Sequence, residues 1–120
     1  MKIMIVDDST AMRMIVKKTL RQAGFDGHEF TEAEDGVKAL AAIKASKPDL
    51  VLSDWNMPNM TGLQLLEALQ AGGQKITFGF ITTEATPDMR AQALGAGAKF
   101  LVSKPFTPES FKEQLGPHIR

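Results

Sequence analysis

Cysteine is missing from the sequence: none of the 120 residues carries a thiol. This absence excludes a disulfide framework and a thiolate metal site, and it fits a reducing compartment. Hydrophobic residues make up 43% of the chain and charged residues 23%, which is typical of globular rather than disordered proteins. A chain of this length can bury one core but not two, so we expect a single domain over residues 1–120.

The sequence also lacks net charge and long apolar runs. Lysine and arginine together number 14, as do aspartate and glutamate, so no overall field attracts nucleic acid or an anionic membrane. The apolar run at residues 1–6 is too short for a signal peptide, and no segment reaches transmembrane length. We therefore expect a cytoplasmic monomer that binds neither nucleic acid nor membrane.

Short apolar runs alternate with longer segments of helical periodicity, which is typical of strand–helix units around a parallel sheet. The five expected strands are Lys2–Val6, His28–Ala33, Leu50–Ser53, Ile76–Thr82 and Phe100–Ser103. The second of these is the most polar, so we expect it at an edge of the sheet. Apolar stripes should pack the helices on the sheet: Met12, Ile15, Val16 and Leu20, then Val37, Leu40, Ala41 and Ile43, then Leu63, Leu66 and Leu69.

Threonine–proline pairs and glycines mark the expected helix boundaries. Each pair offers an N-cap hydroxyl and a proline at the first helical position, so the last two helices should begin near Pro87 and Pro108. Glycines able to adopt a left-handed conformation should follow the first, third and fourth helices: Gly24, Gly72 and Gly97. The last helix should end by Gly116-Pro117, and we expect no effector domain after it.

Four of the expected strands end in charged or hydroxyl side chains. These are Asp7 and Asp8, Asp54, Thr82 with Thr83, and Lys104. The C-terminal ends of parallel strands converge on one edge of the sheet, where open α/β folds bind ligands. Three neighbouring carboxylates repel one another, which a bound cation, raised pKa values or exposure to solvent can relieve. Mg²⁺ suits the oxygen ligands, and a lysine opposite can pair with a phosphoryl oxygen.

Three short runs carry a family resemblance: Ile5–Ser9, Ser53–Met60 and Ser103–Phe106. Together with Glu34-Asp35-Gly36 and Gly97-Ala98, they closely resemble the receiver domains of response regulators, above all the CheY-like single-domain chemotaxis regulators. The resemblance covers the whole chain. It implies a flavodoxin-like, doubly wound α/β fold with a five-stranded parallel sheet in the order 2-1-3-4-5 and five helices.

The resemblance implies a phosphorylation-dependent switch of a two-component system, which is a signalling protein rather than an enzyme. Asp54 would accept a phosphoryl group from a sensor histidine kinase, and Thr82 and Lys104 would contact that group. Phosphoryl transfer depends mainly on positioning and charge neutralisation, which this set of side chains can supply. The output would be chemotaxis, through a target such as a flagellar motor switch protein.

The resemblance also implies the metal ligands. Asp8, Asp54 and the backbone carbonyl of Asn56 would bind Mg²⁺ directly, and Asp7 would act through water. Asn56 and Glu84 occupy the positions that in this family tune the lifetime of the acyl phosphate. Both are polar and able to orient water, so we expect a short-lived phosphoryl group.

Four positions depart from the common pattern of the family or vary within it. Thr61 stands where many members carry an acidic residue, a change that should leave the chemistry intact. Leu101 stands where most members carry tyrosine or phenylalanine, although Phe100 lies beside it. Thr83 is bulkier than the alanine or glycine usual next to the hydroxyl residue, which would narrow access to the site. Gly79 interrupts the fourth strand, where the lack of a side chain costs entropy and packing.

Other functions stay open on the sequence alone. A haloacid-dehalogenase-type phosphatase uses an aspartate nucleophile and Mg²⁺, but it needs a second aspartate where this chain has Ser9. A flavodoxin needs a hydroxyl- and glycine-rich first loop, and Asp7-Asp8 would repel the phosphate of its cofactor. A structural interaction module is a further alternative. Within the receiver family, the chain could also act as a phosphate sink or as a phosphorelay intermediate.

Overall fold

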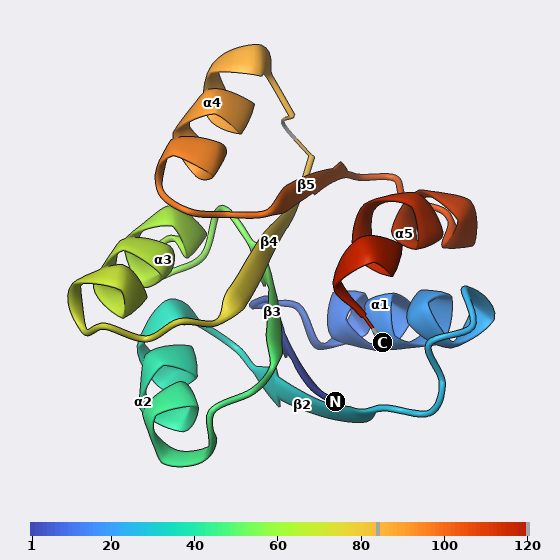
Figure 1. Cartoon of the computed structure of the whole chain (residues 1–120), viewed down its shortest axis with the longest axis horizontal. Helices are drawn as coiled ribbons and strands as arrows, with labels where there is room; N and C mark the ends of the chain where they lie inside the picture. Colours follow the sequence, from blue (N-terminus) through green and yellow to red (C-terminus); the bar gives the residue numbers. More distant parts are fainter. Residues whose placement is uncertain (84, 120) are drawn as a thin grey trace.

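Strands and helices alternate along the chain in a computed structural model that describes residues 1–83 and 85–119 (Figure 1). The strands are β1 (Lys2–Val6), β2 (Glu29–Ala33), β3 (Leu50–Asp54), β4 (Thr77–Thr82) and β5 (Phe100–Ser103). The helices are α1 (Thr10–Gln22), α2 (Gly36–Ser46), α3 (Gly62–Ala71), α4 (Pro87–Gly95) and α5 (Pro108–Leu115), followed by the 3₁₀-helix η1 (Gly116–His118). Among the helices in these two ranges, none has the length and hydropathy to cross a membrane.

The five strands form one parallel sheet in the order β2-β1-β3-β4-β5, which confirms the predicted flavodoxin-like fold. The bounds of β1 and β5 are those predicted, and one end of each other strand differs by a single residue. The polar strand β2 lies at an edge, as predicted. Strands β1 and β3 pair directly with each other, so the residues that follow these two strands come close together.

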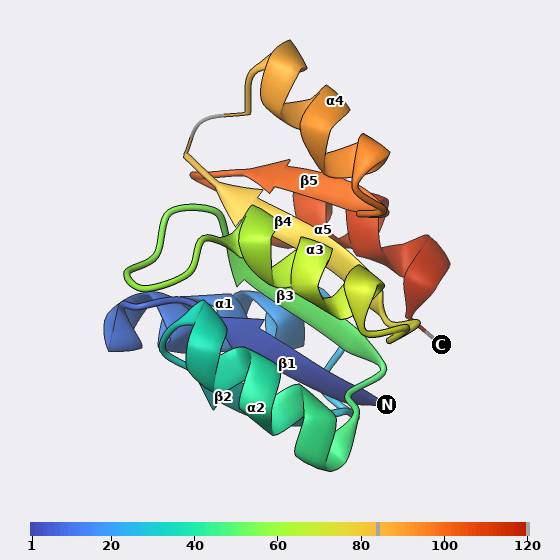
Figure 2. The same ribbon diagram turned by 90° about the vertical axis from the view of Figure 1, so that its left-hand side faces the viewer.

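Helices cover both faces of the sheet. Helices α1 and α5 lie on one face, and α2, α3 and α4 lie on the other (Figures 1 and 2). Side chains of β1 alternate between two buried clusters, with Ile3 and Ile5 on the α1 and α5 side and Met4 and Val6 on the opposite side. Burial on both faces explains why the inner strands β1 and β3 are mostly apolar.

Most residues of the predicted apolar helix faces are buried or partly buried, but some at the margins of these faces are exposed. Val16, Leu20, Ile43, Leu66 and Leu69 are buried as predicted, and Met12, Leu40 and Leu63 are partly buried. The prediction is wrong for Ile15, Val37 and Ala41, which are exposed. Helix α2 instead buries Ala39 and Ile43, which are four residues apart and so share one face. A helix that packs on a sheet through one narrow stripe leaves the flanking apolar positions in solvent.

The predicted N-termini of the last two helices are confirmed. Helix α4 begins at Pro87 and α5 at Pro108, and the preceding threonines cap them: Thr86 accepts a hydrogen bond from the Met89 N–H, and Thr107 from the Ser110 N–H. These side chains satisfy N–H groups that the first turn of a helix leaves without an intrahelical partner.

One of the three predicted helix-ending glycines is wrong. Gly24 and Gly97 have φ of 96° and 108°, as predicted, but Gly72 has φ of −84° and the left-handed residue is Gly73, with φ of 74°. In each of the three helices the left-handed glycine is the second residue past the last helical residue, because the first is the C-cap. The sequence offers two consecutive glycines here, and the prediction chose the cap itself.

Gly79 makes room for a ring of the neighbouring strand. A Cβ atom at Gly79 would lie 2.0 Å from Cε2 of Phe100, its direct partner in β5. Phe100 and Leu101 belong to the two different buried clusters and therefore face opposite sides of the sheet. The ring of Phe100 is therefore not on the side of the sheet that Leu101 faces.

Candidate functional site

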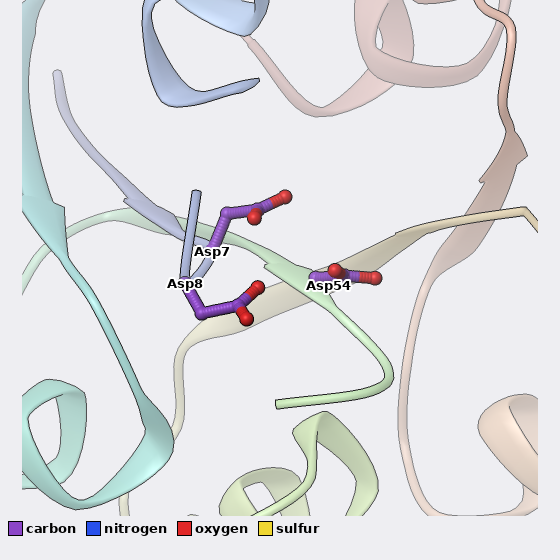
Figure 3. A group of neighbouring side chains, drawn as sticks. All are labelled: Asp7, Asp8 and Asp54. Atoms are coloured by element: carbon purple, nitrogen blue, oxygen red, sulfur yellow. The ribbon is translucent and has the colours of Figure 1, made fainter. Parts of the chain in front are cut away.

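Three carboxylates meet at the C-terminal edge of the sheet, as predicted. Asp7 and Asp8 follow β1, Asp54 ends the adjacent strand β3, and one ligand oxygen of each lies within 4.8 Å of the others. Figure 3 shows the three side chains gathered beside one another where the two strands end. Asp7 is buried, Asp54 is partly buried and Asp8 is exposed, so the cluster is open to solvent on one side.

The backbone next to each strand end holds two of these carboxylates in place. The Ser9 N–H donates to Oδ1 of Asp7 at 2.9 Å, and the Trp55 N–H donates to Oδ1 of Asp54 at 2.8 Å. The Arg13 guanidinium donates to the backbone carbonyl of Asp7, and its Nε lies 2.9 Å from Oε1 of Glu32. Helix α1 and strand β2 thereby fix the chain at Asp7. Sequence reasoning missed this role of Arg13.

Lys104, the residue after β5, faces the cluster. Its Nζ lies 3.3 Å from Oδ2 of Asp7 and 3.5 Å from Oδ2 of Asp54, and its side chain is largely buried. The Lys104 N–H donates to the backbone carbonyl of Thr82 at 2.7 Å, and the Lys104-Pro105 peptide bond is cis. Thr82 ends β4, one residue past the partner of Asp54, and is fully buried. The ends of β1, β3, β4 and β5 thus bring five of the predicted site residues to one edge of the sheet: Asp7, Asp8, Asp54, Thr82 and Lys104.

Three carboxyl groups lie close to the Lys104 ammonium group, so negative charge is in excess when all three are ionised. Burial raises the pKa of Asp54, and the neighbouring charge of Asp7 raises it further, while Lys104 and the Trp55 N–H act in the opposite direction. The net direction is upward, so ionising Asp54 costs more than ionising a carboxyl group in water, and a nearby cation would reduce that cost. Three carboxylates offering hard oxygen atoms suit Mg²⁺, which takes oxygen ligands and keeps some of its waters. The side chains present therefore fit this ion.

The loop from Asp54 to α3 packs tightly against the strand end. The Gly62 N–H donates to the Trp55 carbonyl at 2.8 Å, and the Ser53 hydroxyl donates to the Asp54 carbonyl at 2.8 Å. A Cβ atom at Gly62 would lie 2.2 Å from that same Asp54 carbonyl oxygen. Position 62 therefore accepts only glycine without a shift of the backbone at Asp54. Sequence reasoning missed this, although glycine at the start of a helix has no advantage in helix propensity.

Two further predicted residues follow the ends of β3 and β4. Asn56 is exposed in the loop that follows Asp54, and Thr83 is exposed just beyond β4. Trp55 is buried, with its ring centroid 4.7 Å from that of Phe80. Glu84, which the sequence places near the site, lies outside the described residues.

A flavodoxin-like sheet with three carboxylates and one lysine at its C-terminal edge defines the class of receiver-type α/β proteins. The chain belongs to the response regulator receiver domain family, whose family model matches residues 3–116. This confirms the resemblance that the sequence motifs indicated.

Known proteins similar to this chain include chemotaxis regulators. The chain is 42% identical over 117 residues to chemotaxis protein CheY-3 of Vibrio cholerae, covering 96% of this chain and 88% of that protein. It is 41% identical to chemotaxis protein CheY of Pseudomonas aeruginosa, covering 96% of this chain and 93% of that protein. A solved structure of CheY4 of Vibrio cholerae matches with a TM-score of 0.86 at 34% identity, covering 98% of both chains. The chain is therefore the receiver domain of a CheY-like response regulator.

Proposed function

We propose that the chain is a single-domain phosphorylation switch in which Asp54 accepts the phosphoryl group of a phosphohistidine on a sensor histidine kinase. The observation that carries this proposal is the placement of Asp54 beside two other carboxylates and the Lys104 ammonium, at the C-terminal end of the central strand β3. Lys104 contacts both Asp7 and Asp54, but Asp7 is buried and Asp54 is partly exposed, so a phosphodonor can reach Asp54 more easily.

The proposed reaction is an in-line displacement at phosphorus. A carboxylate oxygen of Asp54 attacks the phosphorus atom, a P–O bond forms, and the P–N bond to the donor imidazole breaks. The leaving imidazole takes a proton from solvent. In the second step, which is hydrolysis, water attacks the phosphorus and the P–O bond to Asp54 breaks. The Asp54 carboxylate is regenerated and inorganic phosphate is released. The chain thus acts on its own side chain and is a signalling protein rather than an enzyme with an external product.

Each neighbouring side chain has a proposed role in this reaction. Lys104 pairs with a phosphoryl oxygen, since its ammonium already lies 3.5 Å from Oδ2 of Asp54. Thr82 contacts the phosphoryl group from the adjacent strand end and reports its presence. Asp8, Asp54 and the backbone carbonyl of Asn56 would hold Mg²⁺, with Asp7 acting through water, and the bound ion would supply positive charge to the phosphoryl oxygens.

The proposed partners follow from the similarity to chemotaxis proteins. The phosphodonor is a sensor histidine kinase, and the phosphorylated chain binds an output target such as a flagellar motor switch protein. The balance of 14 basic and 14 acidic residues fits binding to proteins rather than to nucleic acid.

Mg²⁺ binding tests the metal part of the proposal. Trp55 directly follows Asp54 and its backbone N–H is bonded to that carboxylate, so Mg²⁺ should change the fluorescence of this single tryptophan in a saturable way. Asp8→Asn should weaken the affinity by at least about tenfold, because changes even in outer-shell partners of metals commonly cost that much. Phosphorylation by a small acyl phosphate should stop in a chelator.

Asp49→Asn is the matched control, since Asp49 precedes β3 at the opposite edge of the sheet, where Oδ2 accepts the Lys2 N–H at 2.7 Å. Its Mg²⁺ affinity should equal that of the unmodified protein. Equal affinities for Asp8→Asn and Asp49→Asn, or undiminished phosphorylation in the chelator, would refute the metal role.

A further inference from the structure

The loop between β3 and α3 is tied to the start of a different helix, α2. The side-chain Nδ2 of Asn59 donates to Oδ2 of Asp35 at 3.2 Å, a bond that spans 24 positions of the chain. Asp35 is buried and is the N-cap of α2, where its Oδ1 accepts the Lys38 N–H at 2.8 Å. One oxygen of the Asp35 carboxylate therefore caps α2, and the other binds the loop between β3 and α3.

A second contact joins the same two segments. A Cβ atom at Gly36, the first residue of α2, would lie 2.8 Å from Cβ of Met60. Met60 directly follows Asn59, so the loop backbone rests against the helix terminus at the point where the side-chain bond forms. Substitution of Gly36 would push the loop away from α2.

The loop is strained where the bond is made. Asn59 has φ of 69°, and the Met60 N–H donates to the Pro58 carbonyl at 2.7 Å, which closes a three-residue turn with positive φ at its centre. Such turns are rare, and surrounding structure must hold them in place. Asparagine tolerates this conformation better than most residues and also supplies the amide that reaches Asp35.

We infer that the Asp35–Asn59 bond is a positioning latch that holds the loop bearing Asn56 in the shape that binds Mg²⁺. The inference rests on the proposed function, in which the backbone carbonyl of Asn56 is a metal ligand. Asn56 lies three residues before Asn59, and the same loop begins at Asp54. A loop released at Asn59 samples other backbone conformations, so the carbonyl is no longer presented to the ion and binding must restore its order.

Two single variants break the latch in different ways. Asn59→Gly removes the amide but permits the positive φ, and Asp35→Ser keeps an N-cap oxygen for α2 but no longer reaches Asn59. Each should raise the Kd for Mg²⁺, measured by Trp55 fluorescence without phosphodonor, by about tenfold. The double variant should bind Mg²⁺ as weakly as either single variant, because both remove the same bond. In the metal-free protein, amide exchange over residues 57–61 should be faster in each variant.

Ile43→Val is the control for lost stability. Ile43 is fully buried in α2 and belongs to the core, so this variant destabilises the protein without touching the latch. Its Mg²⁺ affinity should match that of the unmodified protein. An unchanged Kd in Asn59→Gly, or an equal rise in Ile43→Val, would overturn the latch while leaving the proposed function intact. An unmodified protein whose tryptophan shows no response to Mg²⁺ would overturn both.

Discussion

Asp54→Asn should abolish phosphorylation by a small acyl phosphate in the presence of Mg²⁺. The amide of asparagine is a far weaker nucleophile than a carboxylate, and the substitution removes the negative charge of one of the three carboxylates of the cluster. Incorporation of phosphate should fall to the background level, and Asp49→Asn should incorporate phosphate normally. The measurement is the intact mass of each protein after incubation with the donor.

The loss should not result from unfolding. The pKa of Asp54 is raised, mainly by burial, so its ionised form costs stability above that pKa, and the cost disappears as the pH falls through it. Asparagine carries no charge at any pH. In the metal-free protein at neutral pH, Asp54→Asn should therefore melt at a temperature no lower than the unmodified protein. A variant that melts lower, or that still takes up phosphate at Asp7 or Asp8, would contradict this account.

Gly62→Ala should strongly destabilise the protein. The new Cβ would lie 2.2 Å from the Asp54 carbonyl oxygen, so backbone must move rather than a flexible side chain. Overpacking of this kind costs about 1–3 kcal/mol, and the cost should reach the upper end here because backbone is displaced. Helix propensity favours alanine by only about 1 kcal/mol, so the clash prevails. We expect a melting temperature lower by about 10 °C and slower phosphorylation.

Gly95→Ala is the matched control for this prediction. Gly95 is the last residue of α4, and a Cβ atom there would meet nothing within 4 Å. Alanine should leave the stability unchanged or raise it by up to about 1 kcal/mol. Equal melting temperatures for Gly62→Ala and Gly95→Ala would show that the contact with the Asp54 carbonyl places no constraint on residue 62.

The sequence predicts the site well because a simple rule of geometry applies to it. Parallel strands bring their C-terminal ends to one edge, so the residues that follow apolar runs can be located without any coordinates. Asp7, Asp54 and Lys104 follow three such runs, and the structure brings them together. The strand order itself came from the family resemblance rather than from periodicity.

Contacts between distant segments could not be predicted in the same way. The exposure of Ile15 depends on how α1 is rotated against the sheet, which the spacing of apolar residues does not fix to within one position. The constraint on Gly62 and the bond of Asn59 to Asp35 arise where a loop meets a strand end or a helix end. A glycine at the first position of a helix and an asparagine within a loop are common, so neither residue signals its contact.

The position of Leu101 bears on how the phosphoryl group is reported. Leu101 is buried on the α2, α3 and α4 side of the sheet, and it pairs with Phe80 of β4. It has no ring that could move between a buried and an exposed position, and Phe100 faces the opposite side. We therefore propose that Thr82, at the end of β4, carries more of the coupling than the side chain at position 101.

The measurement that tests the account most directly is the location of the phosphoryl group in the unmodified protein. After incubation with a small acyl phosphate and Mg²⁺, borohydride reduction converts a phosphorylated aspartate to homoserine, which peptide mass spectrometry can locate. We predict homoserine at Asp54 alone, and none when the chelator is present. Homoserine at Asp7 or Asp8, or at no aspartate under conditions in which Mg²⁺ is bound, would contradict the assignment of Asp54 as the phosphoacceptor.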